Sequence, residues 1–288
     1  MKKLFYSSFS FGYVLLTILL FPYLLTIFIN GADKALMLHS SDAEVFVPLM
    51  LMVQMKGDYE PETLKAQAVI ARSELYRKLE TESILDVIEE MKEALGEENM
   101  ESGELWNILR LADKLELYGA MVQETRNQVL TYNGELKLVP YHEVSSGETR
   151  DGREVFHSEE FSYLKSVDSS QDKEAPNYIN STYLMRSQLP EKLTVKMRDS
   201  AGYVTFLTAD DRWLEGEAFR VGMHLSSGNF SMQRVENLVR FLCKGKGHGL
   251  GFSQYGGNEM AKGGSSWREI LKKYFPEMEI ENINFIKK

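Results

Sequence analysis

The side chains best suited to bind a ligand lie in a glycine-rich stretch near the C-terminus. Six of the residues from 245 to 257 are glycine, and the stretch also contains His248, Ser253, Gln254 and Tyr255. Glycine permits unusual backbone conformations and lets another group approach the chain closely. We therefore expect a groove for a polymer or another ligand here, in which Ser253, Gln254 and Tyr255 hydrogen-bond to the ligand or hold the loop.

Other kinds of chemistry are compatible with some of these residue types. His248 could be a general base, a ligand or a packed side chain, and its small neighbours leave exposure in a cleft open. A hydrolase pair with Ser253 is disfavoured because the surrounding sequence lacks the G-x-S-x-G pattern of a nucleophile elbow. A phosphate-binding loop is disfavoured because neither G-x-G-x-x-G nor a terminal Lys-Ser/Thr pair is present. The irregular spacing of His142, Glu143 and His157 favours surface positions over a zinc site.

Glu62 is the carboxylate whose position invites a catalytic interpretation. It opens a predicted helix, where the helix dipole favours the charged form, whereas burial beside Tyr59 and an apolar groove wall would raise its pKa. A glutamate that stays protonated near neutral pH can donate a proton to a glycosidic oxygen. The alternative is an ordinary charge at a helix N-terminus.

The elements that must position these residues follow from hydrophobic periodicity and turn signals. Helices are predicted at residues 62–79, 81–100, 105–126, 259–261 and 265–274. Strands are predicted at 128–132, 136–144, 193–197, 203–207, 219–223 and within 230–243, with Asn133-Gly134 as a hairpin turn. This order indicates an α+β fold with helices early and mostly antiparallel strands in the middle, and we expect one domain at 45–288.

Composition limits the possible functions. With 43% hydrophobic residues, the 288-residue chain can bury a large core. Its net charge of −9 argues against nucleic acid as a partner. Cys243 is the only cysteine, so neither an intramolecular disulfide nor a cysteine-based zinc cluster can form. We expect no cofactor and no metal.

The N-terminus is predicted to anchor the chain in a membrane. The uncharged segment at 9–30 is long enough to cross a bilayer as a helix, and Lys2 and Lys3 precede it. Residues 1–8 are therefore expected in the cytoplasm, with 31–44 as a connector to an extracytoplasmic domain. A cleaved signal peptide is the alternative, although Asn30 to Lys34 offers no clear cleavage site.

Two long motifs carry a resemblance to a known family. They are ETLKAQAVIAR at residues 62–72 and GHGLGFSQYG at 247–256, with shorter similar segments at 141–147, 163–167 and 219–220. On these motifs the chain resembles the stage II sporulation protein D family, which includes proteins described as amidase enhancers. The resemblance spans approximately residues 45–275, and the N-terminal anchor is similar as well.

The resemblance implies a peptidoglycan lytic transglycosylase that acts during engulfment of the forespore. Such an enzyme cleaves between N-acetylmuramic acid and N-acetylglucosamine in strands from which a partner amidase has removed the stem peptides. One carboxyl group acts first as acid and then as base toward the 6-hydroxyl of the sugar, so no second carboxylate is needed. On this basis Glu62 is the predicted catalytic residue. The predicted substrate-binding residues are Lys65, Gln67, Arg72, His248, Ser253, Gln254 and Tyr255.

The chain departs from the family pattern at one position that bears on catalysis. Relatives often carry Glu-Met-Pro shortly before the helix, where this chain reads Gln54-Met55-Lys56. If that glutamate is the family's acid, this chain has an amide in its place; if the acid opens the helix, Glu62 is intact. The departure favours a second hypothesis, a non-catalytic glycan binder that activates a cell-wall amidase. Some relatives bind zinc through a histidine and cysteines, but those cysteines are absent here. A tethered domain without glycan affinity is the third hypothesis.

Overall fold

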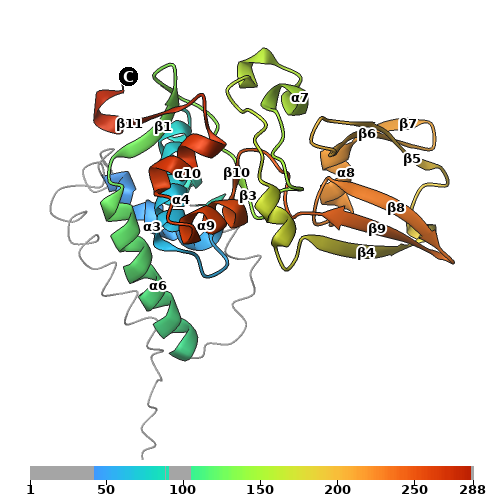
Figure 1. The fold of residues 1–288 in the computed structure, drawn as a ribbon, viewed down its shortest axis with the longest axis horizontal. Coiled ribbons are helices and arrows are strands. Elements are labelled where there is room, and N and C mark those ends of the chain that lie inside the picture. The colour runs from blue at the N-terminus through green and yellow to red at the C-terminus, as the bar shows by residue number, and fades with distance from the viewer. Residues whose placement is uncertain (1–41, 88, 91–104, 287–288) are drawn as a thin grey trace, which may run out of the picture. The chain divides into compact units, whose positions relative to one another are not determined.

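The computed structural model describes residues 42–87, 89–90 and 105–286 (Figure 1). The predicted anchor at 9–30 and much of the predicted helix at 81–100 lie outside these residues and stay predictions. Within the described ranges, no helix is both long and apolar enough to cross a membrane. From Phe46 onward the chain forms one compact unit, which is described below.

Helices α4 (Pro61–Lys78), α9 (Gln254–Lys262) and α10 (Trp267–Tyr274) and a small antiparallel sheet contribute side chains to the first hydrophobic core. Helices α3 (Val47–Gln54) and α6 (Leu105–Glu124) pack against α4. The sheet has the order β11-β1-β2, with β1 at Gln128–Tyr132, β2 at Glu135–Leu136 and β11 at Glu279–Asn282.

Helix α4 forms where the sequence predicts it and is buried along most of its length. Pro61 occupies its first turn, and the apolar residues Leu64, Ala68 and Leu75 are buried. The side chain of Asn258 on α9 accepts a hydrogen bond from the Glu60 amide at the start of α4, at 2.8 Å. Helix α4 is therefore held on several sides, and side chains along it have fixed positions.

The Asn133-Gly134 turn is confirmed, but the return strand after it is shorter than predicted. Both turn residues have positive φ, as a tight hairpin requires. Strand β2 ends at Leu136, and the next strand is β3 (Tyr141–His142), which pairs in parallel with β10 (Phe252–Ser253). This parallel pair brings the glycine-rich stretch at 245–257 beside Tyr141 and His142.

The second hydrophobic core lies among antiparallel strands. One sheet has the order β4-β9-β8, with β4 at Ile179–Met185, β8 at Phe230–Val235 and β9 at Leu238–Lys244. The other has the order β5-β6-β7, with β5 at Leu193–Arg198, β6 at Val204–Ala209 and β7 at Arg212–Glu215. These strands complete the α+β fold that the sequence predicts.

The predicted strand at 219–223 is wrong, because these residues belong to helix α8 (Gly216–Gly222). Helical geometry places the Phe219 ring 5.7 Å from the Phe230 ring and 5.8 Å from the Phe241 ring, inside the second core. Val221, which a strand would have buried with Phe219, is 56% exposed. The remaining short elements are α7 (Gly152–Phe156) and single turns at Asp42–Phe46, Glu159–Phe161, Ser170–Glu174, Arg186–Gln188 and Ile283–Phe285.

Candidate functional site

The glycines of the stretch at 245–257 make room for the protein's own chain. Gly251 has φ near +72°, and a Cβ atom there would lie 2.1 Å from the carbonyl oxygen of Pro140. A Cβ atom on Gly249 would lie 2.3 Å from the Tyr203 ring. The expectation that these glycines admit a ligand is therefore wrong, because neighbouring segments of the protein already occupy the space.

This close packing fixes the His248 ring. Its Nδ1 atom accepts a hydrogen bond from the Leu250 amide at 3.1 Å, and the ring also hydrogen-bonds to the backbone of Tyr141. Burial is the main reason that the pKa of His248 is lowered. A neutral ring held by backbone groups is suited to shape a site, whereas a general base needs an uncommitted nitrogen.

Ser253 is buried, and its hydroxyl makes the contacts of a structural residue, not those of a nucleophile. Its hydroxyl donates a hydrogen bond to Asp172 at 2.8 Å and accepts one from the Gly256 amide, which caps α9. Burial raises the pKa of Asp172, although hydrogen bonds from Ser145 and Ser253 oppose the shift. These contacts assign the Ser253 side chain to the support of α9.

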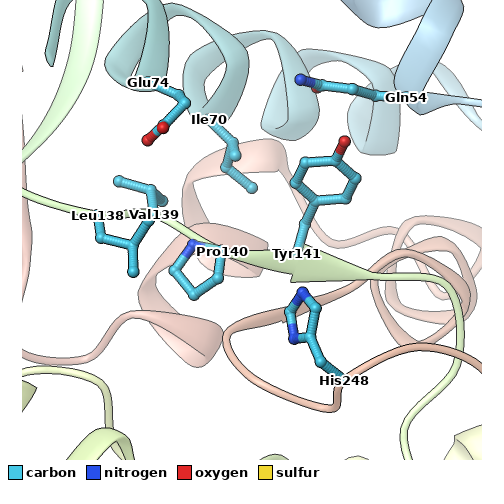
Figure 2. Close-up of a pocket in the computed structure, with 8 residues that line it drawn as sticks. All are labelled: Gln54, Ile70, Glu74, Leu138, Val139, Pro140, Tyr141 and His248. Carbon is cyan, nitrogen blue, oxygen red and sulfur yellow. The ribbon is translucent and has the colours of Figure 1, made fainter. Parts of the chain in front are cut away.

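A pocket of about 340 Å³ opens between α4, the end of α3 and the β3 segment (Figure 2). Its polar lining residues are Gln54, Glu74, Tyr141 and His248. Its apolar lining residues are Ile70, Leu138, Val139 and Pro140. A volume at the lower end of the range for ligand sites, about 300–1,000 Å³, fits a single sugar unit or a group of similar size.

Three glutamines connect this pocket with the two sequence motifs. Gln67 on α4 donates a hydrogen bond from Nε2 to Oε1 of Gln54 at 2.8 Å. Gln254 at the start of α9 donates to the backbone oxygen of Gln54 at 3.0 Å and lies 3.3 Å from Oε1 of Gln67. Both Gln67 and Gln254 are buried, so of the three side chains only that of Gln54 lines the pocket.

Glu62 is held by an ion pair and by a helix terminus. One carboxylate oxygen accepts a hydrogen bond from Lys65 at 2.8 Å, and the other accepts one from the Trp267 amide at the start of α10, also at 2.8 Å. Partial burial raises the pKa of Glu62, but the contacts with Lys65 and Trp267 outweigh it, and the net pKa is lowered. Lys65 also pairs with Glu124 at 2.6 Å. This environment favours the carboxylate over the protonated acid.

The structure places the remaining predicted residues outside the pocket lining. Arg72 is wholly buried, and its guanidinium donates to the backbone oxygens of Thr125 and Val122 at 2.8 and 3.0 Å, at the end of α6. Such contacts satisfy carbonyl groups that a helix end leaves unpaired. Tyr255 is half-buried on α9, and its amide donates to the Glu143 oxygen at 3.0 Å.

Sequence reasoning missed two polar residues of the pocket. Glu74 lies seven positions after Gln67 on α4, so helical spacing puts both on one face and could have indicated it. Its carboxylate accepts two hydrogen bonds from Arg77. Burial, together with the nearby charge of Glu74, raises the pKa of Tyr141 to about 12, so its hydroxyl stays protonated at neutral pH.

Two histidines come close together near the pocket, but a metal site does not result from them. The His142 and His248 rings are 5.8 Å apart, and Nδ1 of His142 lies 3.1 Å from the Leu250 oxygen. Over the described ranges, no three side chains of His, Cys, Asp or Glu form a group that could hold a metal ion.

Comparisons with known proteins point in one direction. A family model described as "Stage II sporulation protein" matches residues 33–132. The chain is 29% identical over 257 residues to stage II sporulation protein D of Bacillus subtilis, covering 82% of this chain and 74% of that protein. It is 28% identical over 256 residues to the protein of the same name from Bacillus amyloliquefaciens, covering 82% and 73%. An uncharacterized protein of Brachyspira hyodysenteriae is 25% identical over 281 residues, covering 91% and 72%.

Proposed function

We propose that this chain, which is similar to stage II sporulation protein D, acts in sporulation by binding the glycan strands of peptidoglycan without cleaving them. The observation that carries this proposal is the identity of residue 54. Its side chain lines the pocket, and it is an amide where relatives often carry a carboxyl group. An amide can hydrogen-bond to a sugar, but it cannot transfer a proton as a glutamic acid does.

The state of Glu62 supports the same proposal. An acid that protonates a glycosidic oxygen needs a raised pKa, as in glycosidases. The pKa of Glu62 is lowered instead, and both carboxylate oxygens already accept hydrogen bonds. This group is suited to joining α4 to α10.

The proposed partner is a cell-wall amidase of the engulfment machinery. Glycan freed of stem peptides is the product of such an amidase, so a protein that holds this glycan could activate or retain the amidase. The proposed setting is the outer face of a membrane, with residues 9–30 as the anchor and residues 1–8 in the cytoplasm.

A test would incubate the full-length protein in detergent with glycan strands that lack stem peptides. Co-sedimentation reports binding, mass spectrometry reports new anhydro-muramoyl ends, and a parallel assay reports stimulation of an amidase. We expect binding and stimulation without new ends. New ends from the unmodified protein would contradict the proposal, and absence of binding would leave only a tethered domain without glycan affinity.

Lytic transglycosylase activity is the second candidate, and one observation favours it. Glu74 is a carboxylate that lines the pocket, so the site does contain a group of the required type. Under this alternative, new ends would form and would be lost in Glu74→Gln or in Glu62→Gln, which identifies the acid. The variant Gln54→Glu supplies a further comparison, because it restores the residue type of the Glu-Met-Pro pattern in relatives.

A further inference from the structure

The hydrogen bonds around Gln54 determine which end of its amide faces the pocket. The starting point is the backbone oxygen of Gln54, which can only accept a hydrogen bond. Gln254 lies 3.0 Å from this oxygen, so the atom that it presents must be its NH₂ group. The thioether of Met55, at 3.2 Å from the same nitrogen, is also only an acceptor and requires the same orientation.

The orientation of the Gln254 amide then determines the orientations of the Gln67 and Gln54 amides. Gln254 has a second N–H, and the nearest side-chain oxygen is Oε1 of Gln67 at 3.3 Å. Reversing the Gln67 amide would place two NH₂ groups against each other, so Gln67 must direct its own NH₂ toward Oε1 of Gln54. This leaves the NH₂ group of Gln54 for the pocket, and none of the residues that the structure describes accepts a hydrogen bond from it.

The rest of the pocket provides complementary groups around this donor. Figure 2 shows Gln54 and the Tyr141 hydroxyl on one side and Glu74 on the other, beside Leu138 and Val139. The pocket thus combines an N–H donor, an apolar wall and a carboxylate acceptor. An acetamido group needs the same three partners, for its carbonyl oxygen, its methyl group and its N–H respectively.

We propose that this pocket binds the N-acetyl group of an aminosugar, and that Gln54, oriented by Gln67 and Gln254, selects that group against a free amine. The inference rests on the proposed glycan binding and deepens it. Gln54 is the specificity residue, because its NH₂ donates to the acetamido carbonyl. Gln67 and Gln254 are positioning residues, because they are buried and act only through Gln54.

The charge of Glu74 is the feature that would favour a free amine, which is cationic. Arg77 compensates this charge, because its guanidinium donates from Nε to one carboxylate oxygen at 3.0 Å and from Nη2 to the other at 2.5 Å. The paired carboxylate retains lone pairs for a neutral N–H, but its attraction for a cation is reduced. The donor at Gln54 additionally disfavours an ammonium group, which has no lone pair to accept a hydrogen bond.

The test measures equilibrium binding of two glycan probes to the full-length protein in detergent. One probe is a set of strands without stem peptides, and the other is the same set after chemical removal of the N-acetyl groups. Loss of a hydrogen bond to a partly desolvated donor corresponds to about tenfold in affinity, so we expect the acetylated strands to bind at least about tenfold more tightly. In Gln54→Glu, which presents an acceptor and a charge, the ratio should fall to one or below.

A second variant changes the orientation of Gln54 without changing Gln54 itself. In Gln67→Glu the buried group can only accept when ionised, so the Gln54 amide must turn its NH₂ toward it and its carbonyl toward the pocket. The acetyl preference should fall in this variant, whereas a residue that only supports the fold would lower both affinities together. Gln233→Glu, at an exposed position on β8, adds the same charge outside the pocket and should leave the ratio unchanged.

The possible outcomes separate this inference from the proposed function. Equal binding of both probes by the unmodified protein, or an unchanged ratio in Gln54→Glu, overturns the inference and leaves glycan binding intact. Failure to bind either probe overturns both. If Gln67→Glu does not fold, as judged by circular dichroism, Gln54→Glu still decides the matter because its side chain lines the pocket.

Discussion

At the residue scale, Glu62 illustrates how one side chain of a functional motif can serve the fold. It lies at the start of α4, yet its carboxylate reaches the first amide of α10, 205 positions along the chain. The amides of a first helical turn have no partner within the helix, so an acceptor from outside stabilises the helix end. Lys65 completes the arrangement by pairing with the other oxygen.

Replacing Glu62 by Gln removes the charge but keeps an acceptor oxygen for the Trp267 amide, so the free energy of unfolding should fall by up to about 1 kcal/mol at pH 7, the usual value of a charge at a helix N-terminus. Since the folded pKa of Glu62 lies below its ordinary value of 4.5, its ionised form stabilises the protein above that pH. The stability is lost as the pH falls through the folded pKa, so the difference between variant and unmodified protein should shrink near pH 3. Urea unfolding at both pH values measures this.

Glu259→Gln is the matched control for that prediction. Glu259 forms the same type of pair with a lysine three residues on, at 2.7 Å, but no backbone amide of another helix in the described part of the chain donates to its carboxylate. A smaller loss is expected. Equal losses in the two variants would show that the charge of Glu62 adds nothing at the start of α10.

At the scale of elements, the glycine-rich stretch packs directly against the segment that forms one wall of the pocket. Pro140 and Tyr141 form one wall of the pocket, and the same Pro140 oxygen accepts a hydrogen bond from the Phe252 amide at 3.0 Å. Gly251 passes directly beside this oxygen. The pocket wall and the glycine stretch are therefore coupled through contacts that leave no space for a side chain.

Gly251→Ala should lower the free energy of unfolding by more than about 3 kcal/mol or prevent folding. A left-handed conformation costs a non-glycine residue about 1–2 kcal/mol, and the collision with a fixed backbone oxygen adds to this. Gly264→Ala is the control, because Gly264 also has positive φ, +90°, but among the described residues no atom lies within 4 Å of its added Cβ. The free energy of unfolding of Gly264→Ala should fall by only about 1 kcal/mol. Thermal unfolding of both variants checks the difference, and similar losses would rule out the collision.

Local signals in the sequence predict some elements and fail for others for identifiable reasons. Helices α4 and α6 are long enough for periodicity to be decisive, and Asn133-Gly134 demands a specific turn. The short segment at 219–223 is ambiguous, because five residues with alternating apolar side chains fit either a strand or one helical turn. The parallel pairing of β3 with β10 depends on residues 111 positions apart, which no local pattern reveals.

The candidate site, too, could be predicted only in part from local sequence patterns. The motifs include Gln67 and Gln254, which the structure brings to Gln54. Glu74 looks like an ordinary helix-surface acid in the sequence, and Tyr141 lies in a segment predicted as a strand. Glu74 and Tyr141 lie in one pocket because α4 packs against the β3 segment. That packing is determined by the hydrophobic core, and neither Glu74 nor Tyr141 indicates it in the sequence.

At the scale of the whole molecule, buried ionisable groups make stability depend on pH in opposite directions. Burial lowers the pKa of His142 to about 3, and His248 and Arg150 add to the shift. The Nε2 atom of His142 has no partner among the described residues, so a proton there would be uncompensated. Asp172, in contrast, has a raised pKa, because burial disfavours its charged form. As the pH falls and Asp172 takes up a proton, its burial destabilises the folded protein less.

The net slope of the protein therefore mixes several groups, and a comparison of variants is needed to isolate one. For His142, the folded pKa lies below the unfolded value of 6.5, so its contribution is complete above pH 6.5 and decreases on acidification. Each pH unit below 6.5 should remove about 1.4 kcal/mol of stability until the folded pKa is reached. His142→Asn retains a donor for the Leu250 oxygen but cannot titrate. It should be less stable than the unmodified protein at pH 7, through lost packing, and should lose about 2 kcal/mol less between pH 7 and pH 5.

Urea unfolding at pH 7, 6 and 5 measures these slopes. The contribution of Asp172 cancels in the difference, because Asp172 is present in both proteins. His157→Asn makes the same substitution at an exposed position and serves as the control for the loss of a histidine side chain. Parallel slopes for the unmodified protein and His142→Asn would mean that the buried ring takes up a proton freely, and would contradict its burial beside His248.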